Sequence, residues 1–173
     1  MRQLLPLPLL LAAPVVGAEP LVRDGGFEAG TVQTFWAQAS SNFGTPVCDA
    51  SCGGVGPHAG VFWVWFGGIA TAAEAASVQQ VGEIAAGPTN LTFQVWWSSS
   101  VASPPDPAAI FSVKMDGNTI FSLTPATATA YNAGYTLASV DISAYADGNG
   151  HTLRFEANSA VGVNATNIQL DDV

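Results

Sequence analysis

The sequence predicts an all-β fold, an antiparallel β-sandwich, from three observations. Short runs of residues alternate between apolar and polar side chains, as expected for strands with one buried face. Clusters of Gly, Pro, Asn, Asp and Ser separate these runs at short intervals, which is typical of sandwiches and jelly rolls. Helical periodicity is missing, and only residues 71–76 could form one turn of helix.

In the first half of the chain, three runs predict strands. Residues 61–66 (VFWVWF) are apolar on both faces, as in a central strand that is covered on both sides, and two glycines end the run. Residues 77–84 alternate less regularly and precede a Gly-Pro turn. Residues 91–97 alternate clearly and are followed by a proline-rich stretch, 98–107, which we expect to be a loop.

In the second half, residues 111–115 and 119–123 are predicted to form a hairpin around Asp116-Gly117-Asn118. Asp-Gly is favoured in tight hairpins because both central residues need positive φ. Three further strands are expected, with turn residues between them: residues 135–145, 151–157 and 166–173.

Residues 1–18 have the features of a secretory signal peptide: a positive start, a short apolar run and a small-residue cleavage site after Ala18. The alternative is a retained N-terminal segment. The apolar run is short and interrupted by proline, so membrane insertion is not expected. Residues 19–173 then form a single β-sandwich domain, secreted or at a bacterial cell surface.

The charge balance limits the partners. The whole chain has 4 Lys and Arg against 13 Asp and Glu, a net charge of −9. Without residues 1–18 only Arg23, Lys114 and Arg154 remain as cations, which makes the net charge −10. Such a chain repels phosphate backbones and anionic lipids, so nucleic acid is excluded as a partner. With 10% charged and 49% hydrophobic residues, it is not a disordered acidic tail either.

Cys48 and Cys52 are the two cysteines, separated by three residues. In an oxidising compartment this pair predicts a local disulfide, which defines the shape of a loop more than it stabilises the whole domain. A metal site is the alternative, but its other soft ligands would be His58 and His151, which lack the spacing of paired ligands.

Two short acidic segments lie at opposite ends of the domain, Asp24-Gly25-Gly26-Phe27-Glu28 and Leu170-Asp171-Asp172-Val173. The first and last strands of a sandwich can be neighbours, so these carboxylates could share one cation. Calcium takes several oxygen ligands, and a Gly-rich backbone can supply carbonyls. The alternative is that these acids are solvated.

Eight motifs, taken in order, resemble a known group, the galactose-binding-like jelly-roll domains, among them the calcium-containing carbohydrate-binding modules of bacterial secreted proteins. The resemblance implies a jelly-roll sandwich, glycan recognition, and a structural calcium bound by Glu28 with Asp171 or Asp172. The motifs are Asp24-Gly25-Gly26-Phe27-Glu28, Trp36, Trp65-Phe66-Gly67-Gly68, Val78-Gln79-Gln80-Val81, Met115-Asp116-Gly117, Val140-Asp141-Ile142-Ser143-Ala144-Tyr145, His151-Thr152-Leu153-Arg154-Phe155-Glu156 and Leu170-Asp171-Asp172-Val173.

Trp96 is the candidate sugar platform, because it shares a strand face with polar residues such as Gln94. An aromatic ring can equally cover a sheet without binding a ligand. Arg154 is expected outward on a neighbouring strand, where it could grip hydroxyl groups or pair with Glu156. Trp63 and Trp65 lie in a run that is apolar throughout, which favours core packing for both.

Nothing in the sequence indicates catalysis. No Gly-x-Ser-x-Gly motif occurs, no pair of carboxylates is spaced for glycoside hydrolysis, and neither histidine is evidently oriented by an acid. Two hypotheses follow: a calcium-stabilised module that binds glycans without catalysis, and a structural or adhesive surface protein that self-associates.

Overall fold

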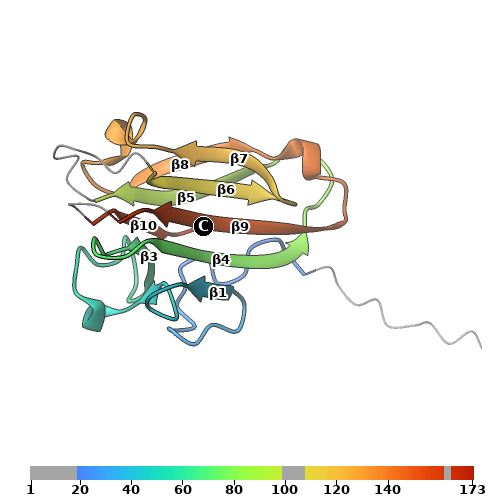
Figure 1. Ribbon diagram of the computed structural model, residues 1–173. Helices are drawn as coiled ribbons and strands as arrows, with labels where there is room; N and C mark the ends of the chain where they lie inside the picture. Colours follow the sequence, from blue (N-terminus) through green and yellow to red (C-terminus); the bar gives the residue numbers. More distant parts are fainter. Residues whose placement is uncertain (1–18, 99–107, 162–164) are drawn as a thin grey trace, which may run out of the picture.

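The computed structural model describes residues 19–98, 108–161 and 165–173 (Figure 1). The predicted signal peptide, 1–18, and nearly all of the predicted loop, 98–107, lie outside the described residues. In the part that is described, no helix is long and apolar enough to cross a membrane.

Two antiparallel sheets of five strands each make up the sandwich (Figure 1). The first sheet has the order β1-β4-β9-β6-β7 and the second the order β2-β3-β10-β5-β8. The strands are β1 (Ala37–Ser40), β2 (Val47–Cys48), β3 (Trp63–Gly67), β4 (Glu74–Glu83), β5 (Asn90–Trp97), β6 (Ile110–Met115), β7 (Asn118–Leu123), β8 (Thr136–Asp141), β9 (Gly150–Ser159) and β10 (Asn167–Asp171). Three short 3₁₀ helices, Ala50–Cys52, Ala128–Tyr131 and Ser143–Tyr145, lie in the connections.

The predicted strands and the predicted hairpin are confirmed, except that the strand expected over residues 135–145 ends at Asp141 and Ser143–Tyr145 forms a 3₁₀ helix. β6 and β7 pair around Asp116 and Gly117, whose φ angles of 51° and 82° are those that the Asp-Gly pair predicts. β9 pairs with both β4 and β6, and β10 pairs with both β3 and β5. The last two strands of the chain therefore each lie in the middle of a sheet.

Two local features were not given by the sequence pattern. The helical turn that residues 71–76 could have formed is absent, because β4 already begins at Glu74 and pairs there with Ser159 of β9. Alternation in sequence also failed to predict β1 and β2. These strands contain only four and two residues, so they carry too short a pattern to be recognised.

The core fills the space between the sheets with alternate residues of each strand. Phe93 of the second sheet packs against Phe111 and Phe155 of the first, with ring centroids 6.3 and 5.3 Å apart. In β5 the predicted inward set is confirmed, since Leu91, Phe93, Val95 and Trp97 are at most 4% exposed. Alternation therefore turns Trp96 to the outer face of the second sheet.

Candidate functional site: a cavity beside the disulfide turn

The outer face of the second sheet carries a row of three side chains on adjacent strands. Trp65 of β3 is the register partner of Gln169 of β10, and Gln169 is in turn the partner of Trp96 of β5. Gln169 is only 1% exposed, whereas both tryptophans are half-buried. Two aromatic rings thus flank a buried amide on a face directed away from the core.

Trp65 therefore does not have the core position that the sequence favoured. Its neighbours in β3, Val64 and Phe66, are fully buried in the core, so Trp63 and Trp65 point to the opposite face. Trp63 is buried there at 1% exposure, and Trp65 remains accessible. A run that is apolar on both faces hides this difference, because either face could be the inner one.

The ring of Trp65 is held in a defined position. Its Nε1 donates a hydrogen bond of 2.9 Å to Oδ1 of Asn167. Gly54 and Gly68 approach the ring so closely that a Cβ on either would lie 3.2 or 3.3 Å from it, and both have positive φ. Glycine is required at both places, because a side chain would displace the ring and strain the backbone.

A cavity of about 540 Å³ opens beside this ring. Its walls come from the loop before β1, the segment that leads into β2, the disulfide turn and the end of β3. The lining residues are Thr31, Phe43, Thr45, Val47, Cys48, Asp49, Ser51, Cys52, Trp65, Gly67 and Gly68. Two aromatic side chains, Trp65 and the 54% exposed Phe43, therefore share a cavity with hydroxyl groups and one carboxylate.

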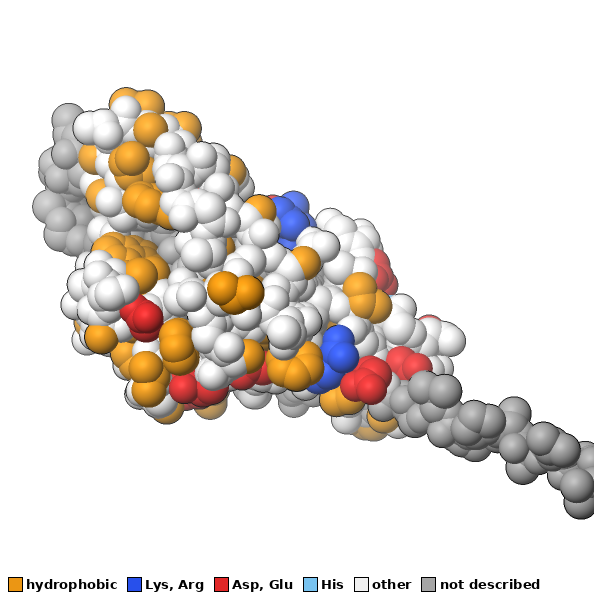
Figure 2. Space-filling view, turned by 90° about the horizontal axis from the view of Figure 1, so that it is seen from below, with side chains coloured by type: hydrophobic (Ala, Val, Ile, Leu, Met, Phe, Trp, Pro, Cys, Tyr) orange, Lys and Arg blue, Asp and Glu red, His pale blue; other side chains and the backbone are white. Residues whose placement is uncertain are grey.

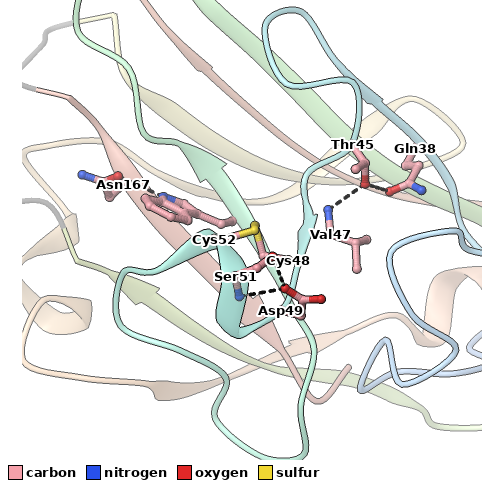
Figure 3. The surroundings of a disulfide bond; sticks show 9 residues. Gln38, Thr45, Val47, Cys48, Asp49, Ser51, Cys52 and Asn167 are labelled. Carbon is pink, nitrogen blue, oxygen red and sulfur yellow. Dashed lines mark hydrogen bonds between the residues drawn. A yellow bond between two sulfur atoms is a disulfide. The ribbon is translucent and has the colours of Figure 1, made fainter.

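The predicted disulfide between Cys48 and Cys52 is present and closes one wall of the cavity (Figure 3). Within the ring, Asp49 Oδ1 accepts hydrogen bonds from Ser51 N at 2.8 Å and from Ser51 Oγ at 2.5 Å. These bonds lower the pKa of the Asp49 carboxyl group, the Ser51 hydroxyl having the largest effect. Asp49 is therefore a carboxylate at neutral pH.

Trp96, the predicted platform, lies outside this cavity but on the same sheet face. Its Nε1 donates to the carbonyl of Asn132 at 3.3 Å, and its ring contacts the edge of Tyr135 with centroids 5.7 Å apart. Gln94 is half-buried two residues earlier on the same face, as the sequence predicts. The connection before β8 thus covers part of Trp96, and the two roles considered for it, structural and binding, are both compatible with this position.

Arg154 does not belong to the same surface, so its predicted place beside Trp96 is wrong. It lies on β9, in the first sheet, while Trp96 lies in the second. Its guanidinium donates to Gln79 Oε1 at 2.7 Å and to Glu156 Oε2 at 2.6 Å, and Lys114 Nζ lies 2.6 Å from the other oxygen of Glu156. The arginine therefore forms the ion pair considered as the alternative. The order of the strands, which alternation in the sequence does not reveal, places Arg154 in the first sheet and Trp96 in the second.

The two acidic segments do meet at one end of the sandwich. The backbone N of Val173 donates to the carbonyl of Gly25 at 3.1 Å. A Cβ on Gly26 would lie 3.6 Å from both Asp172 Oδ1 and the Cγ of Glu28. The convergence expected for the first and last segments of the domain is thus observed.

The carboxylates of these segments are mostly engaged by backbone N–H groups of residues 58–62. Glu28 Oε1 accepts from Val61 and Phe62 at 2.9 and 3.1 Å. Asp171, which is fully buried, accepts from His58 and Ala59 at 2.8 and 3.1 Å through Oδ2. Burial raises the pKa of Asp171 to about 6, opposed by these hydrogen bonds.

The donor chemistry of this cluster suits a hard cation only in part. Asp24 directs its carboxylate to Ala29 N at 3.1 Å, and Asp171 is occupied by amides. Over residues 19–98, 108–161 and 165–173, no three His, Cys, Asp or Glu side chains are grouped so as to hold a metal ion. A calcium site here would thus combine Glu28 and Asp172 with backbone carbonyl oxygens.

Both histidines contact carboxylates, contrary to the sequence-based expectation. His58 Nδ1 lies 2.5 Å from Asp172 Oδ2. His151 lies between two acids, with Nδ1 2.7 Å from Asp116 and Nε2 3.0 Å from Asp147. Hydrogen bonds to Asp116 and then Asp147 raise the pKa of His151. The contacts of His58 with Asp172 and of His151 with Asp116 join segments far apart in the chain, and neither histidine lines the cavity.

Comparisons with known proteins support the fold. No protein-family model matches the chain, and no curated protein matches its sequence. The solved structure of TmCBM61 in complex with β-1,4-galactotriose superposes with a TM-score of 0.58 at 15% identity, covering 90% of this chain and 96% of that one. A structure described under the promiscuous specificity of carbohydrate-binding modules of the β-sandwich superfamily gives 0.49 at 13% identity, covering 90% and 62%. The first likeness confirms the antiparallel β-sandwich fold.

Sequence reasoning missed most of the cavity. Phe43, Thr31 and Asp49 lie in loops and Ser51 lies in the 3₁₀ helix Ala50–Cys52, and the residue types of these segments carry no distinctive pattern. One signal was available: Trp63 and Trp65 alternate with Val64 and Phe66, so one of these two pairs had to face away from the core.

Proposed function

We propose that the protein binds uncharged glycans, without catalysis, in the cavity lined by Trp65. The observation that carries this proposal is the pairing, in one cavity, of aromatic walls with polar acceptors. A pyranose has an apolar face that packs on an aromatic ring and hydroxyl groups that need hydrogen-bond partners. Trp65 and Phe43 offer the rings, while Thr31, Asp49 and Ser51 offer oxygen atoms.

The size and charge of the cavity narrow the class of ligand. About 540 Å³ lies within the usual range of small-molecule sites and accommodates a short oligosaccharide end. The lining residues include an ionised aspartate and no Lys, Arg or His. Figure 2 shows the side of the molecule with β1 and its loops, where few cationic side chains appear. Uronic and sulfated sugars would therefore be repelled.

The fold supports the same proposal. TmCBM61, whose sandwich resembles this one, was solved with β-1,4-galactotriose, an uncharged oligosaccharide. At 15% identity the likeness concerns the fold, and the proposed ligand class rests on the lining of the cavity.

Secretion and calcium belong to the proposal as well. A signal peptide at residues 1–18 would deliver the chain to an oxidising compartment, which agrees with the Cys48–Cys52 disulfide. Calcium, held by Glu28, Asp172 and neighbouring carbonyls, would supply a positive charge between the terminal segments. There it would offset the repulsion of carboxylates brought together by the fold.

An array of neutral, amino and acidic oligosaccharides, read with wild type, Trp65→Ala and Trp96→Ala, tests the function. We expect wild type to bind neutral sugars and to leave the oligosaccharides uncleaved. Trp65→Ala should lower the affinity roughly tenfold or more, because the substitution removes a stacking surface. Trp96→Ala is the matched control on the same sheet face. A loss confined to Trp96→Ala would move the site to that ring, and no binding by wild type would reject the function. Sedimentation of the same samples tests the self-associating alternative.

A further inference from the structure

The geometry of the cavity points to a role for the disulfide in binding. We propose that the Cys48–Cys52 bond holds Asp49 and Ser51 in place as the polar wall of the glycan site, so that its reduction weakens binding while the sandwich stays folded. This proposal rests on the function proposed above for the same cavity.

The covalent ring contains the polar groups of the wall. Four of its five residues line the cavity: both cysteines, Asp49 and Ser51. Asp49 uses Oδ1 to accept both donors of Ser51, at 2.8 and 2.5 Å. Its second oxygen, Oδ2, is left as an acceptor for a hydroxyl group of the ligand. Hydrogen bonds donated to an ionised carboxylate are stronger than those between neutral groups, so this oxygen is suited to fix the orientation of a sugar.

Apart from the disulfide, the hydrogen bonds that hold this turn are local: the two from Ser51 to Asp49 Oδ1 and two within the backbone. The 3₁₀ helix Ala50–Cys52 buries none of its residues, and two backbone bonds close it, Cys52 N to Asp49 O at 3.0 Å and Gly53 N to Ala50 O at 3.4 Å. Three glycines with positive φ follow within four positions, at residues 53, 54 and 56. An exposed turn beside flexible glycines has a low local stability, so it would lose its conformation once the S–S bond is broken.

The sandwich itself does not need this bond. The residues of the ring are not members of the main core cluster, which lies between the two sheets. A ring of five residues also restricts few conformations of the unfolded chain, so it contributes less to global stability than a disulfide that closes a long loop. Binding and folding should therefore separate on reduction.

The test compares oxidised wild type, wild type in excess reductant, and an oxidised Asp49→Asn variant on an array of uncharged oligosaccharides that includes β-1,4-galactotriose. Far-UV circular dichroism and thermal melts accompany each sample. We expect binding by oxidised wild type, and a loss of about tenfold or more both on reduction and for Asp49→Asn, corresponding to one charge-assisted hydrogen bond. The spectra should remain unchanged. A Cys48→Ala/Cys52→Ala variant should bind weakly and not respond to reductant.

The outcomes are distinguishable. If oxidised wild type binds and the reduced protein binds within twofold of it, the disulfide has no role in the site and this proposal falls alone. If reduction unfolds the protein, the claim that the sandwich folds without this bond is overturned, and Asp49→Asn tests the role of the turn: unchanged affinity of this oxidised, folded variant overturns that role too. If oxidised wild type binds no sugar on the array, the proposed function fails, and this inference fails with it.

Discussion

Replacing Asp171 by Ala should strongly destabilise the protein, because this carboxylate organises one end of the sandwich. Asp171 is the last residue of β10 and is fully buried. Its Oδ2 accepts from the N–H groups of His58 and Ala59, and its Oδ1 accepts from the N–H of Asp172 at 2.8 Å. Alanine would leave three backbone donors without their acceptor.

The magnitude follows from these three bonds. A buried donor that loses its partner costs about 1–3 kcal/mol, and more when the partner was charged. The loop at residues 58–59 can relax toward water, so we expect a total near the lower end, about 3–5 kcal/mol. At roughly 2–4 °C per kcal/mol for a domain of this size, the melting temperature should fall by about 6–20 °C.

Urea and thermal unfolding at pH 7.5, in excess chelator, measure this effect without a contribution from bound metal. The pKa of Asp171, about 6, keeps the carboxylate ionised at that pH. Asp24→Ala is the matched control, since Asp24 accepts one exposed N–H at 3.1 Å and should cost less than about 1 kcal/mol. Equal stabilities of the two variants would refute the assignment of Asp171 as the acceptor that holds the 58–59 loop.

Three further predictions concern calcium, pH and a buried acid. If calcium binds as proposed, a calcium concentration a hundredfold above the dissociation constant should raise the free energy of unfolding by about 2.7 kcal/mol. Glu28→Gln should abolish this gain. Identical melting curves with calcium and with chelator would exclude the site. Hydrogen bonds to Asp116 and Asp147 raise the pKa of His151 in the folded protein. Protonated His151 therefore stabilises the folded protein fully below about pH 6.5, and this stabilisation is lost as pH rises through the raised pKa of the folded state. His151→Gln should therefore flatten the pH profile of the melting temperature, and a profile parallel to that of wild type would disprove this. Glu74 is 3% exposed and accepts hydrogen bonds from Ser40 and Ser41. Glu74→Ala should therefore lower the free energy of unfolding in urea by about 2–4 kcal/mol. A decrease below about 0.5 kcal/mol would show that water replaces these bonds.

Alternation along the sequence was enough to predict the strands that have one buried face. In residues 91–97 and 151–157 the side-chain period of two is regular, and it places Phe93 and Phe155 in the core, as observed. Local chemistry was also sufficient for the Asp116-Gly117 turn and for the Cys48–Cys52 disulfide, because each depends on residues close together in the chain.

Tertiary structure decided which strands share a sheet, and therefore which side chains share a surface. The period of two says which face a residue occupies, but not which sheet its strand joins. Arg154 was expected near Trp96, yet β9 and β5 lie in different sheets. Both faces of β3 are apolar, so only packing could show that Val64 and Phe66 point inward and that Trp65 points outward.

The cavity depended still more on three-dimensional contacts. Phe43, Asp49 and Trp65 are separated by loops without regular periodicity, and their meeting results from the pairing of β2 with β3 and from the path of the disulfide turn. The sequence by itself determined an acidic β-sandwich with a local disulfide and acidic terminal segments. The position of the cavity is a property of strand order and loop packing, which act between residues far apart in the chain.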